Sequence, residues 1–213
     1  NTDAASNLRL QATANNVAGT SLPVDSFFMY TAGNYFKNRL NSGYAVNVGD
    51  YLYSASYDKG EGYTSAEILT TFNSNCVPTY GKNLFVFSKL NVYKGASAPA
   101  PKFKIAVSGN LINQRRYQVN INSDSVISNS VDFFNYAVDS TQFSLNTLHS
   151  VLDTVTVFNY TSAYPVGCPP NDRMVIHKYE ITYPRNFNFN GLSSFEFSLA
   201  ANAAGNDLQI TNF

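Results

Sequence analysis

Residues 174–199 read MVIHKYEITYPRNFNFNGLSSFEFSL, and the first half of this stretch alternates two sets of side chains. One set is Val175, His177, Tyr179, Ile181 and Tyr183, and it is interleaved with Ile176, Lys178, Glu180 and Thr182. A period of two places successive side chains on opposite faces of a β-strand. Pro184 has no N–H for a sheet ladder, so we predict that this strand ends before it.

The second half of the stretch predicts another strand. Phe195, Phe197 and Leu199 alternate with Glu196 and Ser198, and the turn signal Asn190-Gly191 lies before them. We therefore expect two strands of one sheet, with one apolar face and one face in water.

Similar short segments recur along the chain. The strand candidates are residues 8–12, 27–30, 35–40, 44–57, 84–93, 103–107, 117–121, 131–138, 155–160 and 208–213. In residues 84–93 we expect the face with Leu84, Val86 and Leu90 to lie in the core. The clearest helix signal is Thr64-Ser65-Ala66-Glu67, which fits a capping box. Residues 144–152 fit either a helix or a loop.

These signals predict an all-β protein built as an antiparallel β-sandwich, with at most one or two short helices. It resembles either one jelly-roll-like unit or two docked Ig-like sandwiches. The segment Gly95-Ala96-Ser97-Ala98-Pro99-Ala100-Pro101 reads as a linker or a long loop. We therefore expect sandwich parts at 1–94 and 102–213, with a single domain over 1–213 as the alternative.

The composition excludes some classes of function. Charged residues make up 13% of the chain, aromatic residues 15%, and the formal net charge is zero. The largest cluster of basic residues is the pair Arg115-Arg116, so the chain has no basic patch for nucleic acid. No run approaches the roughly 20 apolar residues of a membrane helix. The chain begins at Asn1 without an initiator methionine, so we expect that a targeting segment was removed or that the numbering follows an expressed fragment.

Two cysteines occupy similar contexts, each next to proline-containing loop sequence. Cys76 lies in Asn75-Cys76-Val77-Pro78 and Cys168 in Gly167-Cys168-Pro169-Pro170. We predict a disulfide between Cys76 and Cys168 and an oxidising location, extracellular or on a cell or particle surface, with two unrelated thiols as the alternative. Asn159-Tyr160-Thr161 also fits the N-glycosylation pattern, although chance matches are common in a chain so rich in Asn and Thr.

Known catalytic motifs are missing from the sequence. It contains no nucleophile elbow and no glycine-rich nucleotide loop. His149 and His177 stand alone, and two cysteines with two distant histidines lack the paired spacing of a zinc site. We therefore expect a protein that is not an enzyme and needs no cofactor.

Loop residues supply the candidate ligand site. Asp58-Lys59-Gly60-Glu61-Gly62 is the most polar glycine-rich loop, and Tyr57 and Tyr63 flank it. Asn171-Asp172 follows the Cys168 loop and is a second candidate. Carboxylates and carbonyls at Asp58 and Glu61 could hold calcium, although the spacing of an EF-hand loop is missing.

Two classes of function follow. The first is a structural or assembly subunit, such as a filament, surface-layer, adhesin or capsid-like protein, because interfaces enrich aromatic residues and deplete charge. The second is a carbohydrate-binding module that uses Tyr, Asn and Asp from loops at one end of the sandwich. We expect self-association or contact with other surface proteins, with glycans as the alternative partner. An extended flat patch of exposed aromatic residues would favour assembly, and a concave polar cluster would favour a ligand.

Overall fold

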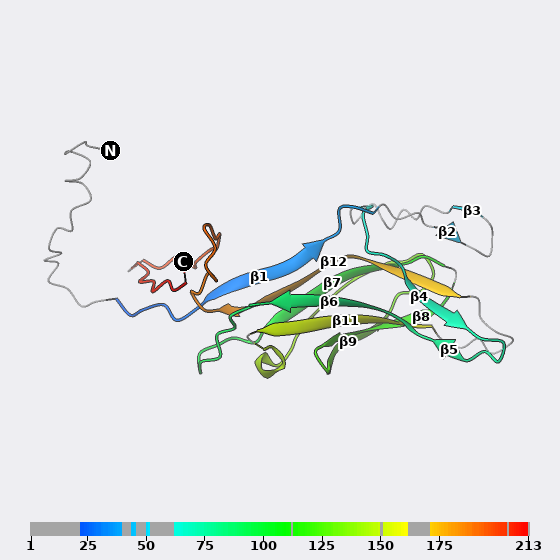
Figure 1. Cartoon of the computed structure of the whole chain (residues 1–213), viewed down its shortest axis with the longest axis horizontal. Helices are drawn as coiled ribbons and strands as arrows, with labels where there is room; N and C mark the ends of the chain where they lie inside the picture. Colours follow the sequence, from blue (N-terminus) through cyan, green and yellow to red (C-terminus); the bar gives the residue numbers. More distant parts are fainter. Residues whose placement is uncertain are drawn as a thin grey trace, which may run out of the picture.

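The computed structural model describes residues 22–39, 44–45, 50–51, 62–111, 113–149, 151–161, 171–203 and 205–212. They form two antiparallel sheets packed face to face, so the predicted all-β sandwich is confirmed (Figure 1). In this part of the chain, the only helical element is the short 3-10 turn η3 (Leu145–Thr147).

The first sheet is organised around the longest strand, β12 (Asp172–Arg185). Its order is β10 (Tyr136–Gln142), β7 (Lys102–Gly109), β12, β4 (Ile68–Phe72) and β5 (Pro78–Thr79). Strand β1 (Phe28–Tyr35) also pairs with β12, from Phe28 opposite Arg185 to Tyr35 opposite Lys178. Strands β4 and β1 therefore follow one another along the side of β12 that faces away from β7.

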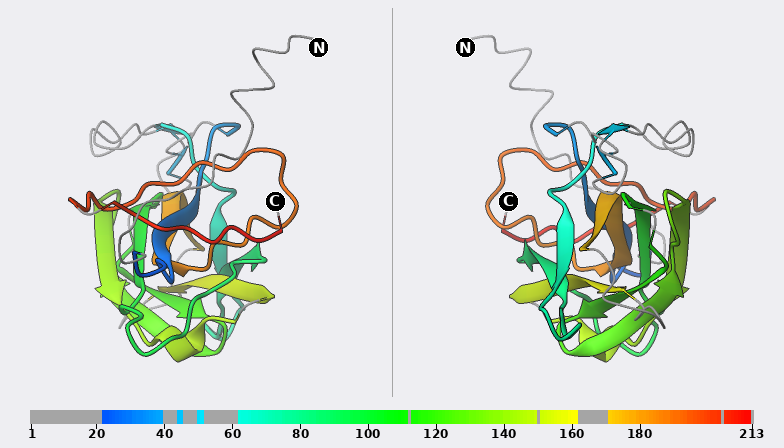
Figure 2. Two further views of the ribbon diagram at one scale, coloured as in Figure 1. Left: turned by 90° about the vertical axis from the view of Figure 1, so that its left-hand side faces the viewer. Right: turned by 90° about the vertical axis from the view of Figure 1, so that its right-hand side faces the viewer.

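The second sheet contains β6 (Gly81–Ser88), β11 (Leu152–Thr161), β8 (Arg115–Ile121) and β9 (Asp124–Ser130), in that order. Strands β2 (Tyr44–Ala45) and β3 (Asp50–Tyr51) form a separate short hairpin. Figure 2 shows the two layers of the sandwich from its ends.

Both sheets join strands from before and after residues 95–101. Strand β6 pairs with β11, and β1 and β4 pair with β12. The expected division into parts 1–94 and 102–213 therefore does not separate two sandwiches. Pairing between distant segments overrides the linker-like composition of residues 95–101.

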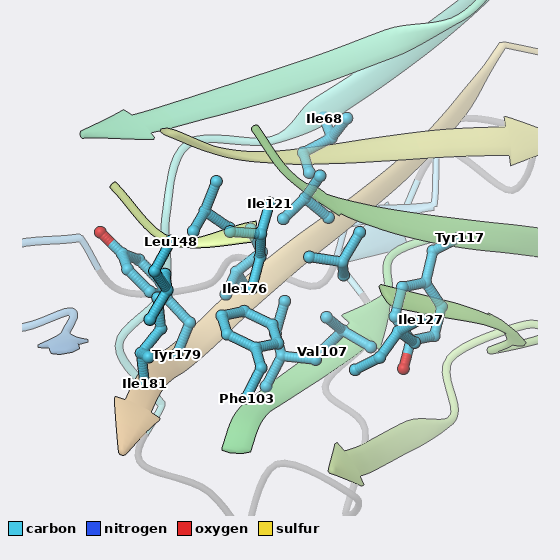
Figure 3. Close-up of a cluster of buried hydrophobic side chains, with 14 of the residues drawn as sticks. Ile68, Phe103, Val107, Tyr117, Ile121, Ile127, Leu148, Ile176, Tyr179 and Ile181 are labelled. Carbon is cyan, nitrogen blue, oxygen red and sulfur yellow. The ribbon is translucent and has the colours of Figure 1, made fainter. Parts of the chain in front are cut away.

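The core lies between the facing sides of the two sheets (Figure 3). Strands β7 and β12 contribute Phe103, Ile105, Val107, Ile176, Tyr179 and Ile181, and strands β8 and β11 contribute Tyr117, Val119, Ile121, Val155 and Val157. All of these side chains are buried. A second, smaller cluster of Phe28, Phe187 and Phe189 fills one end of the sandwich.

A β-bulge at His177 changes the phase of β12. The register with β7 shifts between Ile176 and Lys178. Ile176 faces the core before the bulge, and Tyr179 faces it after the bulge. The strict alternation predicted from the sequence put these two residues on opposite faces, which is wrong because the bulge inserts one extra residue.

The sequence predicted that the strand ends before Pro184, and this prediction is wrong. Strand β12 continues to Arg185, with Pro184 opposite Met29 on β1. The carbonyl of Pro184 still accepts a hydrogen bond of 2.9 Å from the N–H of Tyr93. Proline removes only a donor, and Pro184 lies beyond Thr182, the last residue of β12 that pairs with β7, so no ladder bond to β7 is lost.

The predicted helix after Thr64 is also wrong, because Ile68–Phe72 is strand β4. Ser65 pairs with β12 and does not cap a helix. Its N–H donates to the carbonyl of Ile176 at 2.8 Å, and the N–H of Ile176 donates to its hydroxyl at 3.0 Å. Tertiary hydrogen bonds thus outweigh the local capping pattern.

Residues 195–199 and 208–213 were predicted as strands, but the residues described there belong to no named strand. Phe195 and Phe197 pack on Phe28 instead, with ring centroids 6.1 and 4.9 Å away. The alternation of residues 195–199 thus reflects docking on an aromatic cluster rather than pairing in a sheet.

Candidate functional site

Strand β6 turns its aliphatic face to solvent. Leu84 is 59% exposed and Val86 is 56% exposed. Phe85 and Phe87 face the core, where their rings lie 4.5 and 5.7 Å from the ring of Tyr179. The prediction that Leu84 and Val86 lie in the core is therefore wrong. The larger aromatic rings take the inner face because they bury more apolar area.

Strand β11 extends this apolar surface. Leu152 lies opposite Ser88 on β6 and is 52% exposed, and the preceding Val151 is 75% exposed. We call Leu84, Val86, Val151 and Leu152 the aliphatic patch. Leu84, Val86 and Leu152 lie on the outer face of the second sheet and Val151 lies just before β11, and a monomer gains nothing from exposing these four aliphatic side chains.

The patch borders an open strand edge. Strand β6 is the first strand in its sheet, and no described strand pairs with its other side. Between Asn83 and Ser88 there is no proline, glycine or charge, and the register with β11 contains no bulge. Prolines, charges and bulges are the features by which natural edge strands avoid pairing with other chains, and this segment has none of them. Within the described part of the chain, the second half of β6 is therefore an unprotected edge.

An aromatic strip continues the same face along β11, and we define it as Tyr80, Phe158 and Tyr160. The rings of Phe158 and Tyr160 stack at 5.6 Å with an interplanar angle of 14°. Tyr80 meets Tyr160 edge-on at 4.7 Å. Gln118 and Arg116 on β8 lie opposite Phe158 and Tyr160. The strip thus has polar neighbours on one side.

The residues predicted as a ligand site do not form one cluster in the described structure. Tyr57, Asp58 and Glu61 lie outside the described residues, so their role stays a prediction. Tyr63 is exposed. Asn171 is also exposed, and its side-chain oxygen accepts a hydrogen bond of 3.3 Å from the N–H of Phe72.

Asp172 points into the protein. Its carboxylate is fully buried and accepts hydrogen bonds from Arg115, from Asn113 at 3.1 Å and from Asn159 at 2.8 Å. Both oxygens are occupied and covered, so a surface ligand could not reach them. The exposed-loop reading of Asp172 missed that it begins β12.

Asn159, the acceptor residue of the glycosylation motif, is also buried. The side-chain nitrogen of Asn159 donates to Asp172 and, at 3.1 Å, to the carbonyl of Ile68. No part of Asn159 is exposed. A glycan on this nitrogen is incompatible with the folded chain, so the motif is a chance match in sequence.

The two histidines differ in burial. His177 Nε2 lies 2.6 Å from the hydroxyl of Ser108, and both residues are buried. His149 is exposed, with Nδ1 3.9 Å from Asp153. No group of three metal-ligating side chains occurs among the residues that the structure describes. No helix in these residues is long and apolar enough to cross a membrane.

Comparison with protein-family models found no match, and comparison with curated proteins found none either. Among solved structures, the chain is similar to dimeric latent PorU from Porphyromonas gingivalis, with 8% identity and a TM-score of 0.45. That match covers 81% of this chain and 14% of PorU.

A second similar structure is the CBM36-1 domain of a multidomain xylanase from the hindgut metagenome of Trinervitermes trinervoides. It has 10% identity and a TM-score of 0.33, and the match covers 54% of this chain and 95% of that domain. Neither match carries an argument about function at these values.

Proposed function

We propose that this chain is a non-catalytic subunit of an extracellular or particle surface that assembles with copies of itself through β6. The single observation that supports this function is the unprotected edge of β6 next to the aliphatic patch. An exposed strand edge offers a row of unpaired backbone groups, and an apolar patch adds the hydrophobic driving force.

Two copies of β6 can pair antiparallel about Phe85. In that register, Leu84 of one copy lies opposite Val86 of the other, and Asn83 lies opposite Phe87. No like charges therefore meet, and aliphatic side chains line up on one face. The contact is isologous, because each copy uses the same surface. It would join two four-stranded sheets into one continuous sheet.

Light scattering after gel filtration tests this assembly, with electron microscopy of the same fractions. We expect the native chain to elute above its monomer mass of 23.4 kDa. Leu84→Lys should release monomers, because the new charge would have to be desolvated against Val86 of the partner copy. Ser130→Lys is the matched control, since it adds the same charge to the exposed edge strand β9. Native protein that stays at monomer mass at high concentration would contradict the assembly.

Carbohydrate binding is the second candidate, and the aromatic strip supports it. Stacked rings beside Gln118 and Arg116 could hold the apolar face of a sugar ring and bind its hydroxyls. A glycan array tests this, with Tyr160→Ala and the control Leu84→Ala. Loss of binding in Tyr160→Ala alone, at unchanged mass, would favour this candidate.

The non-catalytic assignment and the calcium proposal at Asp58 and Glu61 have their own tests. Hydrolase activity on polysaccharide or peptide substrates that disappears in Glu61→Gln would contradict the first. Calorimetric titration with calcium tests the second, because binding to the native chain should be lost in Asp58→Lys.

A further inference from the structure

A hollow of about 510 Å³ lies at the end of the sandwich where β1 begins. Asp25 and residues 27–29 form one side of it, and residues 198–202 with Asn206 approach from the other side. Figure 1 shows these two segments, the start of β1 and the C-terminal part of the chain, at the same end of the molecule. The hollow has the size of a small-molecule site.

The wall of the hollow is largely apolar. Phe27, Phe28, Met29 and Leu199 line it. Phe28 is buried in the smaller aromatic cluster, and Phe27 stacks on Tyr93 with ring centroids 5.0 Å apart. These contacts hold the wall in place, so the apolar surface is formed before any ligand arrives.

Asp25 supplies an unusual polar group in this wall. Its Oδ2 atom is buried and has no hydrogen-bond partner among the described residues. No ion pair of Asp25 with a described lysine, arginine or histidine is present either. A buried acceptor without a donor is costly, and native structures avoid it unless something else supplies the donor.

The backbone fixes Asp25 in this position. Its N–H donates to the carbonyl of Asp207 at 2.8 Å, and Val24 forms a parallel bridge with Asp207. These backbone contacts hold the segment that carries the Asp25 carboxylate against the segment that contains Asp207. Asn202 and Asn206 belong to the same C-terminal segment and also line the hollow.

We propose that this hollow binds a polyhydroxylated ligand of the size of one sugar ring. A ring hydroxyl would donate to Asp25 Oδ2, and further hydroxyls would bind the amides of Asn202 and Asn206. The C–H face of the ring would lie on Phe27 and Leu199. A hydroxyl group both donates and accepts, so it suits carboxylate and amide groups together.

An ammonium or guanidinium group fits less well. It only donates, so it could bind Asp25 and an amide oxygen, but it would offer no acceptor to any amide N–H group that faces the hollow. The chemistry of the whole hollow therefore favours a neutral polyol over a cation.

A neighbouring hollow of about 400 Å³ extends the site. It also includes Asp25, and its lining residues include Asn91, Asn186, Asn188 and Gln209. A glycan longer than one ring would continue from the apolar hollow into this polar one, with Asp25 between them. The site involves neither β6 nor the aromatic strip, so it goes beyond the proposed assembly and the second candidate.

NMR titration of the full chain tests the site, with glucose, galactose, mannose, xylose, N-acetylglucosamine and their disaccharides as probes at tens of millimolar. We expect shifts at residues 25–29 and 198–207, and tighter binding of a disaccharide than of its monosaccharide. Asp25→Asn should weaken binding about tenfold or more, because it removes a charged acceptor. Glu196→Gln is the matched control and should change nothing, since Glu196 is an exposed carboxylate outside the hollow.

Ala201→Trp gives a second variant that does not depend on the buried carboxylate. Ala201 lines the hollow but is exposed, so a large side chain there would fill the hollow without disturbing the core. Binding should then be lost at unchanged thermal stability. The proposal is overturned if no sugar probe shifts these resonances. It is also overturned if butylamine binds there more tightly than every sugar. Either result would leave the mass measurement on Leu84→Lys unaffected.

Discussion

Arg115 on β8 and Asp172 at the start of β12 form a fully buried ion pair between the two sheets. Arg115 Nε lies 2.8 Å from Asp172 Oδ2, and Nη2 lies 2.7 Å from Oδ1. Both side chains are 0% exposed. The remaining donors of Arg115 bind the carbonyls of Leu111, Val131 and Phe133. The guanidinium therefore fixes the loop before β8 and the loop after β9 to the first sheet.

Asp172→Asn should destabilise the fold strongly, because it leaves the Arg115 charge buried without a counter-charge. Removing one partner of a buried pair costs about 3–5 kcal/mol. Urea unfolding measures this change. The control is Lys104→Met, which removes the partly exposed pair with Glu180 at 3.7 Å and should cost less than about 1 kcal/mol. Equal effects of the two variants would contradict the anchoring role of Arg115.

Phe85→Ala and Leu84→Ala should differ sharply, although the two residues are neighbours on β6. We expect Phe85→Ala to cost about 2–4 kcal/mol, somewhat below the range for fully buried rings because Phe85 is half-buried. Leu84→Ala should stay within about 0.5 kcal/mol in the monomer, because the side chain of Leu84 is largely exposed. Urea unfolding at low protein concentration separates them. A larger loss of stability in Leu84→Ala than in Phe85→Ala would instead support the sequence-based prediction that Leu84 lies in the core.

Alkaline pH should destabilise the chain through its buried tyrosines. Burial raises the pKa of Tyr179 to about 12. Burial also raises the pKa of Tyr183 to about 12, with Arg185 acting in the opposite direction. The unfolded chain releases these protons near pH 10, so their contribution to stability is complete below pH 10 and is lost as pH rises through 12.

The loss should be at most about 1.4 kcal/mol per pH unit for each tyrosine, and smaller where solvent screens the hydroxyl group. Urea midpoints at pH values of about 9, 10 and 11 measure it. Tyr179→Phe should make the decline shallower, and Tyr63→Phe, which changes an exposed tyrosine, should leave it unchanged. A native chain with constant stability across this interval would contradict the burial of both hydroxyl groups.

The predicted disulfide can be tested directly. Cys168 lies outside the described residues, but the contact of Asn171 with Phe72 brings a nearby part of the chain to the end of β4. Cys76 lies in the turn that follows β4, where its N–H donates to the backbone carbonyl of Asn73 at 2.9 Å. We expect thiol titration of the wild-type chain, unfolded in urea, to detect no free thiol until reductant is added.

Cys76→Ser with Cys168→Ser should then lower the free energy of unfolding. The chain-entropy model gives about 4–5 kcal/mol for a loop of about 90 residues. Reduced native protein should match the double variant. Two titratable thiols in the absence of reductant would refute the bond.

The candidate surface on β6 could not be chosen from the sequence. Leu84 and Val86 alternate with Phe85 and Phe87, so both faces of this strand are apolar. Only the position of Tyr179 on the opposite sheet decides which face is buried. The hollow at Asp25 was equally hidden, because one side comes from Asp25 and residues 27–29 and the other from residues 198–202 and 206, far away in the chain.

The sequence by itself determined the class of the fold, because a period of two is a local property that each strand carries in its own residues. It also showed the low charge and the absence of known catalytic motifs. Only the tertiary structure decided the bulge at His177, the burial of Asp172 and the outer face of β6. Each of these depends on the register between strands far apart in the chain, and a shift of one residue reverses every side chain.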